Sequence, residues 1–262
     1  MSLLIFTVYN NDNRNIANEY FDIWRNLKTR SALKKKNLLW LYLFLFATLV
    51  DMAFILERNT ELRFFPKPLI LIGLIGYFYS FTKPISSTLL AKTILGALIF
   101  SLVGDILLLW DQLFIYGIGA FMLAHVCYII GFKVAQKAPE SVLNVNFIKT
   151  FFINLPIYFL GAFAFYMINP NLGNLKIPVV VYIIVIVSML TTARERYRKC
   201  NPTSFWQVFI GACLFFISDG IIALDKFYQP IPDASVLIMG SYAIAQLMIV
   251  MGIRSHIIQP KP

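Results

Sequence analysis

The sequence predicts an all-α, polytopic membrane protein with about eight transmembrane helices, and three observations lead to this prediction. Of the 262 residues, 59% are hydrophobic and only 14% are charged. The apolar residues fall in blocks of about 17 to 23, which is the length that a helix needs to cross a bilayer. Stretches such as "VVVYIIVIVSML" are apolar on every face, whereas the helices of a soluble domain would be amphipathic.

Hydropathy averaged over about 19 residues places one span in each apolar block. The expected spans are residues 38–56, 67–83, 88–110, 113–133, 147–168, 176–192, 204–224 and 235–253. The second and the sixth are short and open near Pro68 and Pro178; proline suits a first helical turn because the N–H that it lacks would be unpaired there. The domains expected from this pattern are a cytoplasmic extension, a transmembrane domain and a cytoplasmic tail, at residues 1–37, 38–255 and 256–262.

The distribution of basic residues predicts the orientation of the chain. With the N-terminus in the cytoplasm, only five of the 23 Lys and Arg residues fall in outer segments, namely Arg58, Arg63, Lys67, Lys176 and Lys226. Positive residues favour the cytoplasmic side when the loops are short. Both termini are therefore expected in the cytoplasm, with the protein in the plasma membrane or the endoplasmic reticulum.

The net charge of +10 does not require a nucleic-acid partner. The basic clusters "RSALKKK" and "RERYRK" each adjoin a predicted span on its cytoplasmic side. At such positions they act as topology signals and attract anionic membrane lipid. The three cysteines lie within spans or in a cytoplasmic loop, so they do not indicate a disulfide framework.

An internal similarity indicates two parallel four-helix repeats. The stretch "GALIFSLVGDILLLWD" from Gly96 matches "GACLFFISDGIIALD" from Gly211 when one residue is gapped before the aspartate. In each stretch a second aspartate follows six residues after the first. Because an even number of spans separates the two stretches, the two repeats would share one orientation in the membrane.

The repeats place two carboxyl groups, those of Asp105 and Asp219, at one depth inside the membrane. At 1.5 Å per residue, each lies roughly 22 to 26 Å from the cytoplasmic boundary. His125 and Gln246 occupy matching positions in the spans that follow and reach down from the outer side. Intramembrane carboxyl groups are costly and usually functional, so we expect a site there; a structural hydrogen bond between helices is the alternative.

Other polar residues are candidates for contacts with a substrate. Tyr242 lies four residues before Gln246 on one face of the last span, and Asn154 lies in the fifth span. Like His125, they could serve either the site or an interhelical hydrogen bond. Asp111, Asp225 and Lys226 fall at helix ends, where they could be solvated boundary residues or contacts for a polar headgroup.

Four motifs together resemble the lysoplasmalogenase family, the YhhN-type membrane hydrolases. They are "GDILLLW" in the third span, "AHVCY" in the fourth, "FFISDGIIALDKF" in the seventh and "YAIAQ" in the eighth. The resemblance covers about residues 38 to 255. It implies an eight-span enzyme that hydrolyses the vinyl ether bond of lysoplasmalogens, with a fatty aldehyde and a glycerophosphocholine or glycerophosphoethanolamine as products. It also implies that Asp105 and Asp219 are the catalytic residues and that the partners are a lysophospholipid and membrane lipid.

The chemistry of two buried carboxyl groups agrees with that activity. Vinyl ether hydrolysis needs a proton delivered to the alkene carbon, stabilisation of an oxocarbenium ion and a directed water molecule. Two carboxyl groups in opposite protonation states could supply all three, one as general acid and the other as the ionised partner. The sequence alone leaves open which aspartate has which role.

Two rival interpretations come from other classes. A zinc hydrolase needs about three converging His or Cys ligands, but the chain has only His125 and His256. We therefore expect neither a metal nor another cofactor. A proton-coupled transporter of small molecules or lipids is the stronger alternative, because that class shares intramembrane aspartates and internal repeats.

Overall fold

The computed structural model describes residues 33–59, 61–136 and 147–258 and shows there an all-helical bundle. Eight long helices are present in this part of the chain, and all eight are long and apolar enough to cross a membrane. They are α2 (Leu33–Leu56), α3 (Pro66–Thr82), α4 (Leu89–Leu107), α5 (Phe114–Val134), α6 (Phe147–Ile168), α7 (Lys176–Glu195), α8 (Pro202–Phe227) and α9 (Ala234–Ile258). The predicted fold class and all eight predicted spans are confirmed. Most of the predicted N-terminal extension, residues 1–32, lies outside the described residues.

The starts of two helices are fixed by capping side chains. Thr88 Oγ1 accepts a hydrogen bond from the Ala91 amide at the start of α4. Asn201 Oδ1 accepts one of 2.7 Å from the Ser204 amide at the start of α8, where Pro202 is the first helical residue. Such caps satisfy amides that have no partner within the helix. They fix the first turns of the two helices that carry the predicted catalytic aspartates.

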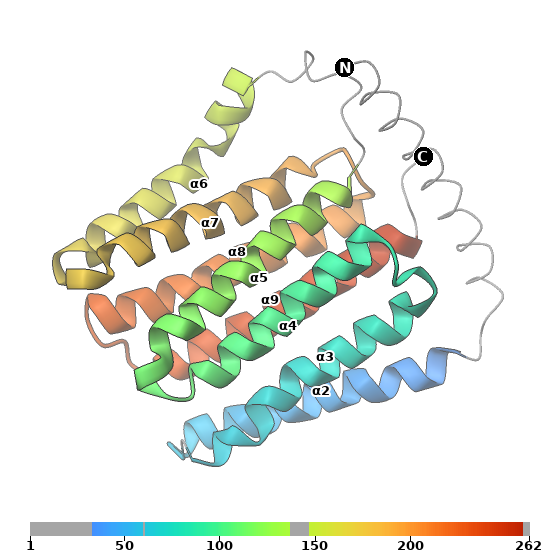
Figure 1. Ribbon diagram of the computed structural model, residues 1–262, viewed down its shortest axis with the longest axis horizontal. Coiled ribbons are helices and arrows are strands. Elements are labelled where there is room, and N and C mark those ends of the chain that lie inside the picture. Colours follow the sequence, from blue (N-terminus) through green and yellow to red (C-terminus); the bar gives the residue numbers. More distant parts are fainter. Residues whose placement is uncertain (1–32, 60, 137–146, 259–262) are drawn as a thin grey trace.

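The helices pack mainly as antiparallel hairpins, α2 with α3, α4 with α5, and α8 with α9 (Figure 1). The α8–α9 contact is close because both helices carry glycine there. A Cβ atom on Gly211 would lie 2.9 Å from the carbonyl oxygen of Ala245, and one on Gly252 would lie 2.8 Å from the Val208 amide nitrogen. Small residues let helices in a membrane approach this closely.

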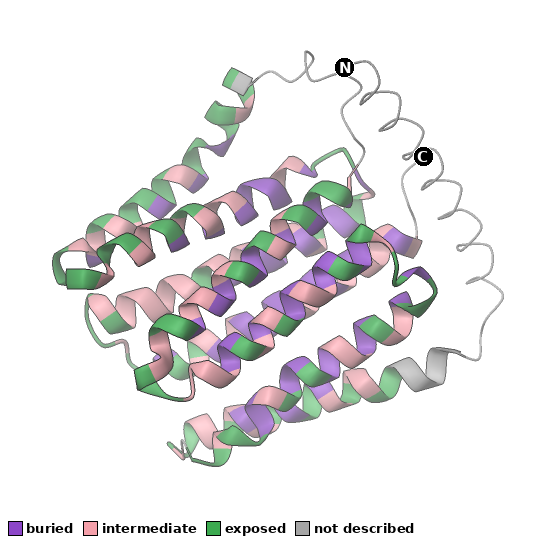
Figure 2. Ribbon diagram, in the orientation of Figure 1, coloured by how far each residue is buried: buried purple, intermediate pink, exposed green. Residues whose placement is uncertain are grey.

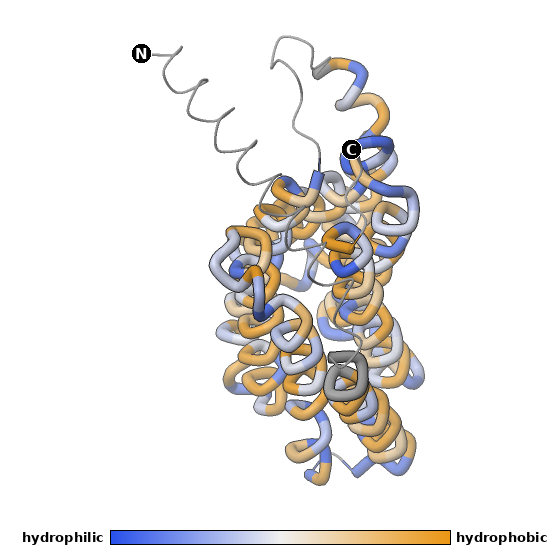
Figure 3. The backbone as a smooth tube through the Cα atoms, turned by 90° about the vertical axis from the view of Figure 1, so that its right-hand side faces the viewer, coloured by the Kyte–Doolittle hydropathy of each residue, from blue (hydrophilic) through white to orange (hydrophobic). Residues whose placement is uncertain are grey.

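The core of the bundle lies among α3, α4, α5, α8 and α9. Buried residues are concentrated there, whereas α2 and α6 expose much of their surface (Figure 2). The exposed side chains of α6 include large apolar groups such as Phe159 and Tyr166. Hydrophobic residues follow the helices along their length, and many hydrophilic ones lie near the helix ends (Figure 3). An apolar exterior of this kind faces lipid.

Helix α6 does not pack beside α5, which precedes it in the chain. It contacts α7 and, less extensively, α8, while α5 packs against α7. Ile168 at the end of α6 lines the same cavity as Phe114 of α5 and Phe227 of α8. We call the end of the bundle with residues 57–59, 61–65, 108–113, 169–175 and 228–233 the outer end, after the predicted orientation, and the opposite end the inner end.

A buried arginine holds the inner end together. Arg196 follows α7 and is fully buried, and its guanidinium donates to the Ala135 carbonyl and to both the carbonyl and the hydroxyl of Ser204. Burial lowers the pKa of the Arg196 guanidinium to about 10, so it stays charged at neutral pH. These hydrogen bonds tie the end of α5 to the connection between α7 and α8.

Candidate active site

Asp105 lies near the outer end of α4, in the buried interior of the bundle. The residue before it, Gly104, leaves room for a neighbouring ring, since a Cβ atom there would lie 2.6 Å from Phe121. Asp105 Oδ2 accepts a hydrogen bond of 2.8 Å from the Tyr242 hydroxyl on α9. Asp105, a predicted catalytic residue, and Tyr242, a predicted substrate contact, are therefore in direct contact.

Asp219 lies on α8 within a second group of polar side chains. Its Oδ2 atom accepts a hydrogen bond from the Tyr182 hydroxyl on α7 and lies 3.1 Å from His125 Nε2 on α5. The same histidine nitrogen lies 3.0 Å from the Tyr182 hydroxyl oxygen. His125 is fully buried, and among the described residues its Nδ1 atom has no hydrogen-bond partner. Both Asp219 contacts involve one carboxyl oxygen, Oδ2.

The partners of the two aspartates are exchanged between the predicted repeats. Asp105 of α4 is bonded to Tyr242 of α9, the helix that follows α8. Asp219 of α8 contacts His125 of α5, the helix that follows α4. These side-chain contacts join the α4–α5 hairpin to the α8–α9 hairpin. The repeat itself stays a prediction.

Aromatic rings lie between the two polar groups. The Phe215 ring is fully buried, with its centre 4.8 Å from the His125 ring and 5.4 Å from the Tyr242 ring. The Phe121 ring lies 5.9 Å from Tyr242 and 6.2 Å from Phe215. In the described part of the chain, no hydrogen bond or ion pair joins Asp105 to Asp219. Each carboxyl group thus has partners of its own, and a proton shared between the two stays a prediction.

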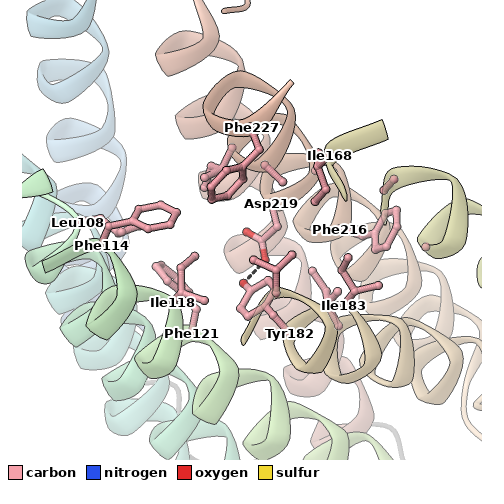
Figure 4. A pocket seen from close by; sticks show the side chains of 17 residues that line it. Leu108, Phe114, Ile118, Phe121, Ile168, Tyr182, Ile183, Phe216, Asp219 and Phe227 are labelled. Atoms are coloured by element: carbon pink, nitrogen blue, oxygen red, sulfur yellow. Dashed lines mark hydrogen bonds between the residues drawn. The ribbon is translucent and has the colours of Figure 1, made fainter. Parts of the chain in front are cut away.

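A cavity at the outer half of the bundle reaches Asp219 (Figure 4). The space between its walls is about 720 Å³, a volume that includes open solvent at its mouth. Among its lining residues only Asp219 is charged, and only Tyr182 adds a further polar side chain. The lining residues are Leu108, Phe114, Ile118, Phe121, Gly161, Ala164, Ile168, Val179, Tyr182, Ile183, Ile186, Phe216, Asp219, Gly220, Ile222, Ala223 and Phe227.

The position of this cavity corrects one expectation. From the matched repeats, a cavity between spans three, four, seven and eight would be expected. The observed walls come from α4, α5, α6, α7 and α8, so α9 is absent from the lining and α6 and α7 contribute. Asp105, Tyr242 and Gln246 also do not line it. The reason is that α5 packs on α7, which brings the α6–α7 pair against the outer half of α8.

The other predicted site residues are distributed over the bundle. Gln246 is buried and accepts a hydrogen bond from Tyr128, and Asn154 accepts one of 2.9 Å from Arg194 near the inner end. Asp225 accepts one of 2.8 Å from the Ile231 amide. The Lys226 ammonium lies 4.2 Å from the centre of the Phe114 ring, which lines the cavity. Asp111 is exposed in the short helix η3 (Asp111–Leu113).

Two functional candidates, Tyr182 and Lys67, were missed from the sequence. Tyr182 sits within an apolar run, and its hydroxyl was the only signal of a polar contact. Lys67 at the start of α3 was counted as an outer loop charge, yet only 7% of its surface is exposed. Its ammonium interacts electrostatically with Asp105 and with the ion pair between Arg63 and Asp51, whose closest atoms are 3.0 Å apart. Asp105 therefore lies beside a charged network that reaches the outer end.

Comparison with known proteins identifies a family and several relatives of the chain. A family model described as the YhhN family matches residues 62–253. The human protein named lysoplasmalogenase TMEM86B is 31% identical over 154 residues, which are 59% of this chain and 60% of that protein. Its mouse counterpart is 29% identical over 192 residues, 71% of this chain and 75% of the relative. A lysoplasmalogenase of Mycobacterium bovis is 32% identical over 167 residues, 62% of this chain and 60% of the relative. No solved structure matches significantly.

Proposed function

Because the chain belongs to the YhhN family, we propose that it is a lysoplasmalogenase, a membrane enzyme that hydrolyses the vinyl ether bond of lysoplasmalogens. The products would be a fatty aldehyde and glycerophosphocholine or glycerophosphoethanolamine. The observation that carries this proposal is the apolar cavity whose only charged lining residue is Asp219. Such a site suits a hydrocarbon chain that carries a single reactive bond.

Asp219 would act as the general acid. Its Oδ2 atom accepts the Tyr182 hydrogen bond and contacts His125 Nε2, so Oδ1 is the oxygen left to carry the reacting proton. The acid delivers this proton to the alkene carbon that is not bonded to oxygen, and an oxocarbenium ion forms at the other carbon. General acid catalysis of this kind contributes about 10² to 10⁴ in rate.

The remaining steps return the site to its starting state. Water adds to the oxocarbenium ion and gives a hemiacetal, and the proton that it loses restores the Asp219 carboxyl group. Breakage of the carbon–oxygen bond of the hemiacetal then releases the aldehyde and the glycerol hydroxyl. Tyr182 and the Nε2–H tautomer of His125 would stabilise the intermediate carboxylate by donating to Oδ2; this tautomer is inferred from the hydrogen-bond partners.

Lys226 would bind the phosphate of the headgroup. It lies seven residues after Asp219, which is two turns along α8, or about 10.5 Å on the same face of the helix. Its ammonium rests on Phe114 at the edge of the cavity. Asp111 and Asp225 lie at the same end of the bundle and could attract a positively charged headgroup amine.

The first prediction tests the reaction itself. The purified protein in detergent should release aldehyde from a lysoplasmalogen and should leave the matching alkyl ether intact, because an alkyl ether has no alkene carbon to protonate. In D₂O the aldehyde should carry one deuterium on the carbon next to its carbonyl group, as measured by mass spectrometry. Aldehyde without that deuterium would contradict protonation at carbon. Activity only in sealed vesicles with a gradient would favour a transporter.

The second prediction concerns Tyr182. Replacing Tyr182 by Phe removes the hydroxyl that donates to Asp219 and keeps the ring in the cavity wall. We expect turnover to fall by about 10- to 150-fold, because one hydrogen bond to a charged group contributes about 1.5 to 3 kcal/mol. Tyr166→Phe is the control, since Tyr166 is exposed on α6 and lies outside the cavity. Equal turnover in the two variants would remove Tyr182 from the mechanism.

A further inference from the structure

Four small residues line the cavity on two of its helices. Gly161 and Ala164 lie on α6, and Gly220 and Ala223 lie on α8. In each helix the two positions are three residues apart, so they lie on one face. The other residues that α8 contributes include Phe216 and Phe227, which are large. The small side chains at these four positions therefore leave the cavity wider beside Asp219 than larger side chains would.

The two glycines differ in what surrounds them. A Cβ atom on Gly161 would lie 2.6 Å from a methyl carbon of Val187, so this glycine allows α6 to pack closely on α7. A Cβ atom on Gly220 would meet no atom within 4 Å. Because Gly220 also lines the cavity, a side chain there would occupy ligand space without displacing protein atoms.

Gly220 directly follows Asp219, so its Cα lies one residue from the only charged residue of the cavity. Gly220 and Asp219 therefore contribute neighbouring parts of the same cavity wall. The remaining walls are apolar apart from Tyr182, so the part of the ligand held there is hydrocarbon. A second hydrocarbon chain would need further apolar space beside the first.

We propose that Gly220 determines which hydrocarbon chains reach Asp219, by leaving room for one unbranched aliphatic chain beside the carboxyl group. The ligand class is a lipid with a single chain. This inference rests on the proposed function for the identity of the reacting bond, and it adds the residue that selects the chain. A larger side chain at position 220 narrows the cavity and excludes the chain.

The test is a series of substitutions at two glycines. Gly220 is replaced by Ala, Val and Leu, and Gly119 on α5 receives the same replacements. Gly119 is a matched control, because a Cβ atom there also meets nothing within 4 Å, yet Gly119 does not line the cavity. The probe is a lysophosphocholine with a 16-carbon alkyl ether chain, which the enzyme would bind without cleaving. The measurements are its dissociation constant and the melting temperature of each variant.

Gly220→Leu should weaken binding of the probe by at least about 10-fold, with Val and Ala giving smaller losses in that order. The Gly119 variants should bind within about twofold of the original protein, since surface-like positions without contacts are tolerant. The melting temperature should stay level or rise at both positions, because the helix gains a better helix former without a clash. If Gly220→Leu does not fold, Gly220→Ala still decides, as it adds one carbon in open space.

Equal binding by matched Gly220 and Gly119 variants would overturn the inference. The inference is also overturned if Gly220→Leu binds both a two-chain ether phosphatidylcholine and the single-chain probe as tightly as the original protein binds them. Failure of the proposed function gives a different result. In that case the original protein binds the probe, and Gly220→Leu loses it, but no aldehyde forms from a lysoplasmalogen.

Discussion

Asp219→Asn is expected to lower aldehyde release by about 10² to 10⁴, the usual contribution of a positioned acid or base. The amide keeps the size of the side chain and can still accept the Tyr182 hydrogen bond at its oxygen. It has no proton that it can donate to an alkene carbon. The expected loss is therefore in turnover, with little change in the binding of an uncleavable ether analogue. Steady-state kinetics with a lysoplasmalogen, combined with a binding titration, measure the two effects separately.

The control for this variant is Asp233→Asn, the same chemical change in an exposed loop outside the cavity. Asp233 has a positive φ of 53°, and asparagine tolerates this region well. Turnover and melting temperature should match those of the original protein. If Asp219→Asn is folded and turns over at nearly the same rate, the acid is another group. If it loses binding together with turnover, Asp219 positions the substrate and does not supply the proton.

The helices were predictable because each is long and apolar, which hydropathy detects without knowledge of neighbours. The starts of α3 at Pro66 and of α7 at Lys176 agree with the proline signals read from the sequence. The packing order was not predictable. Helices that are apolar on every face carry little information on which face meets which neighbour, so the contact of α5 with α7 and the outlying position of α6 appear only in the structure.

The same limit explains which site residues were found. A charged or imidazole side chain in an apolar span is conspicuous, so Asp105, Asp219 and His125 were predicted together, and the structure brings the last two into contact. Tyr182 is not one of the polar residues that match between the two predicted repeats. A tyrosine in a span also occurs as an ordinary packing residue. Asn154 looked equivalent in the sequence, but its partner is Arg194 near the inner end.

Lys67 was misread for a different reason. Positions near helix ends are assigned to loops by hydropathy, and a loop lysine is counted only as a topology signal. In the structure the first turn of α3 is covered, so Lys67 is buried and interacts with Asp105, Arg63 and Asp51. The Asp105 carboxyl therefore has a hydrogen bond from Tyr242 and an electrostatic interaction with the buried ammonium of Lys67.

The last prediction tests whether these two charges compensate each other, by changing Lys67 and Asp105 separately and together. Lys67→Met removes a buried ammonium that interacts electrostatically with the Asp105 carboxyl, although the two groups form no direct ion pair in the described part of the chain. We expect a clear drop in the melting temperature in detergent. In Lys67→Met combined with Asp105→Asn both charges are removed, so much of the stability should return. Lys92→Met is the control, because Lys92 is exposed on α4 and its loss should change little.

Turnover of the double variant then separates two roles for Asp105. Asp105 does not line the cavity, and aromatic rings separate its partner Tyr242 from His125. We therefore expect the stable double variant to lose much less turnover than Asp219→Asn does. A loss as large as that of Asp219→Asn, in a variant with restored melting temperature, would instead make Asp105 the second half of a catalytic pair, as the matched repeats predict. Equal instability of the single and double variants would contradict the charge compensation itself, because removal of both charges leaves no unpaired ion to destabilise the fold.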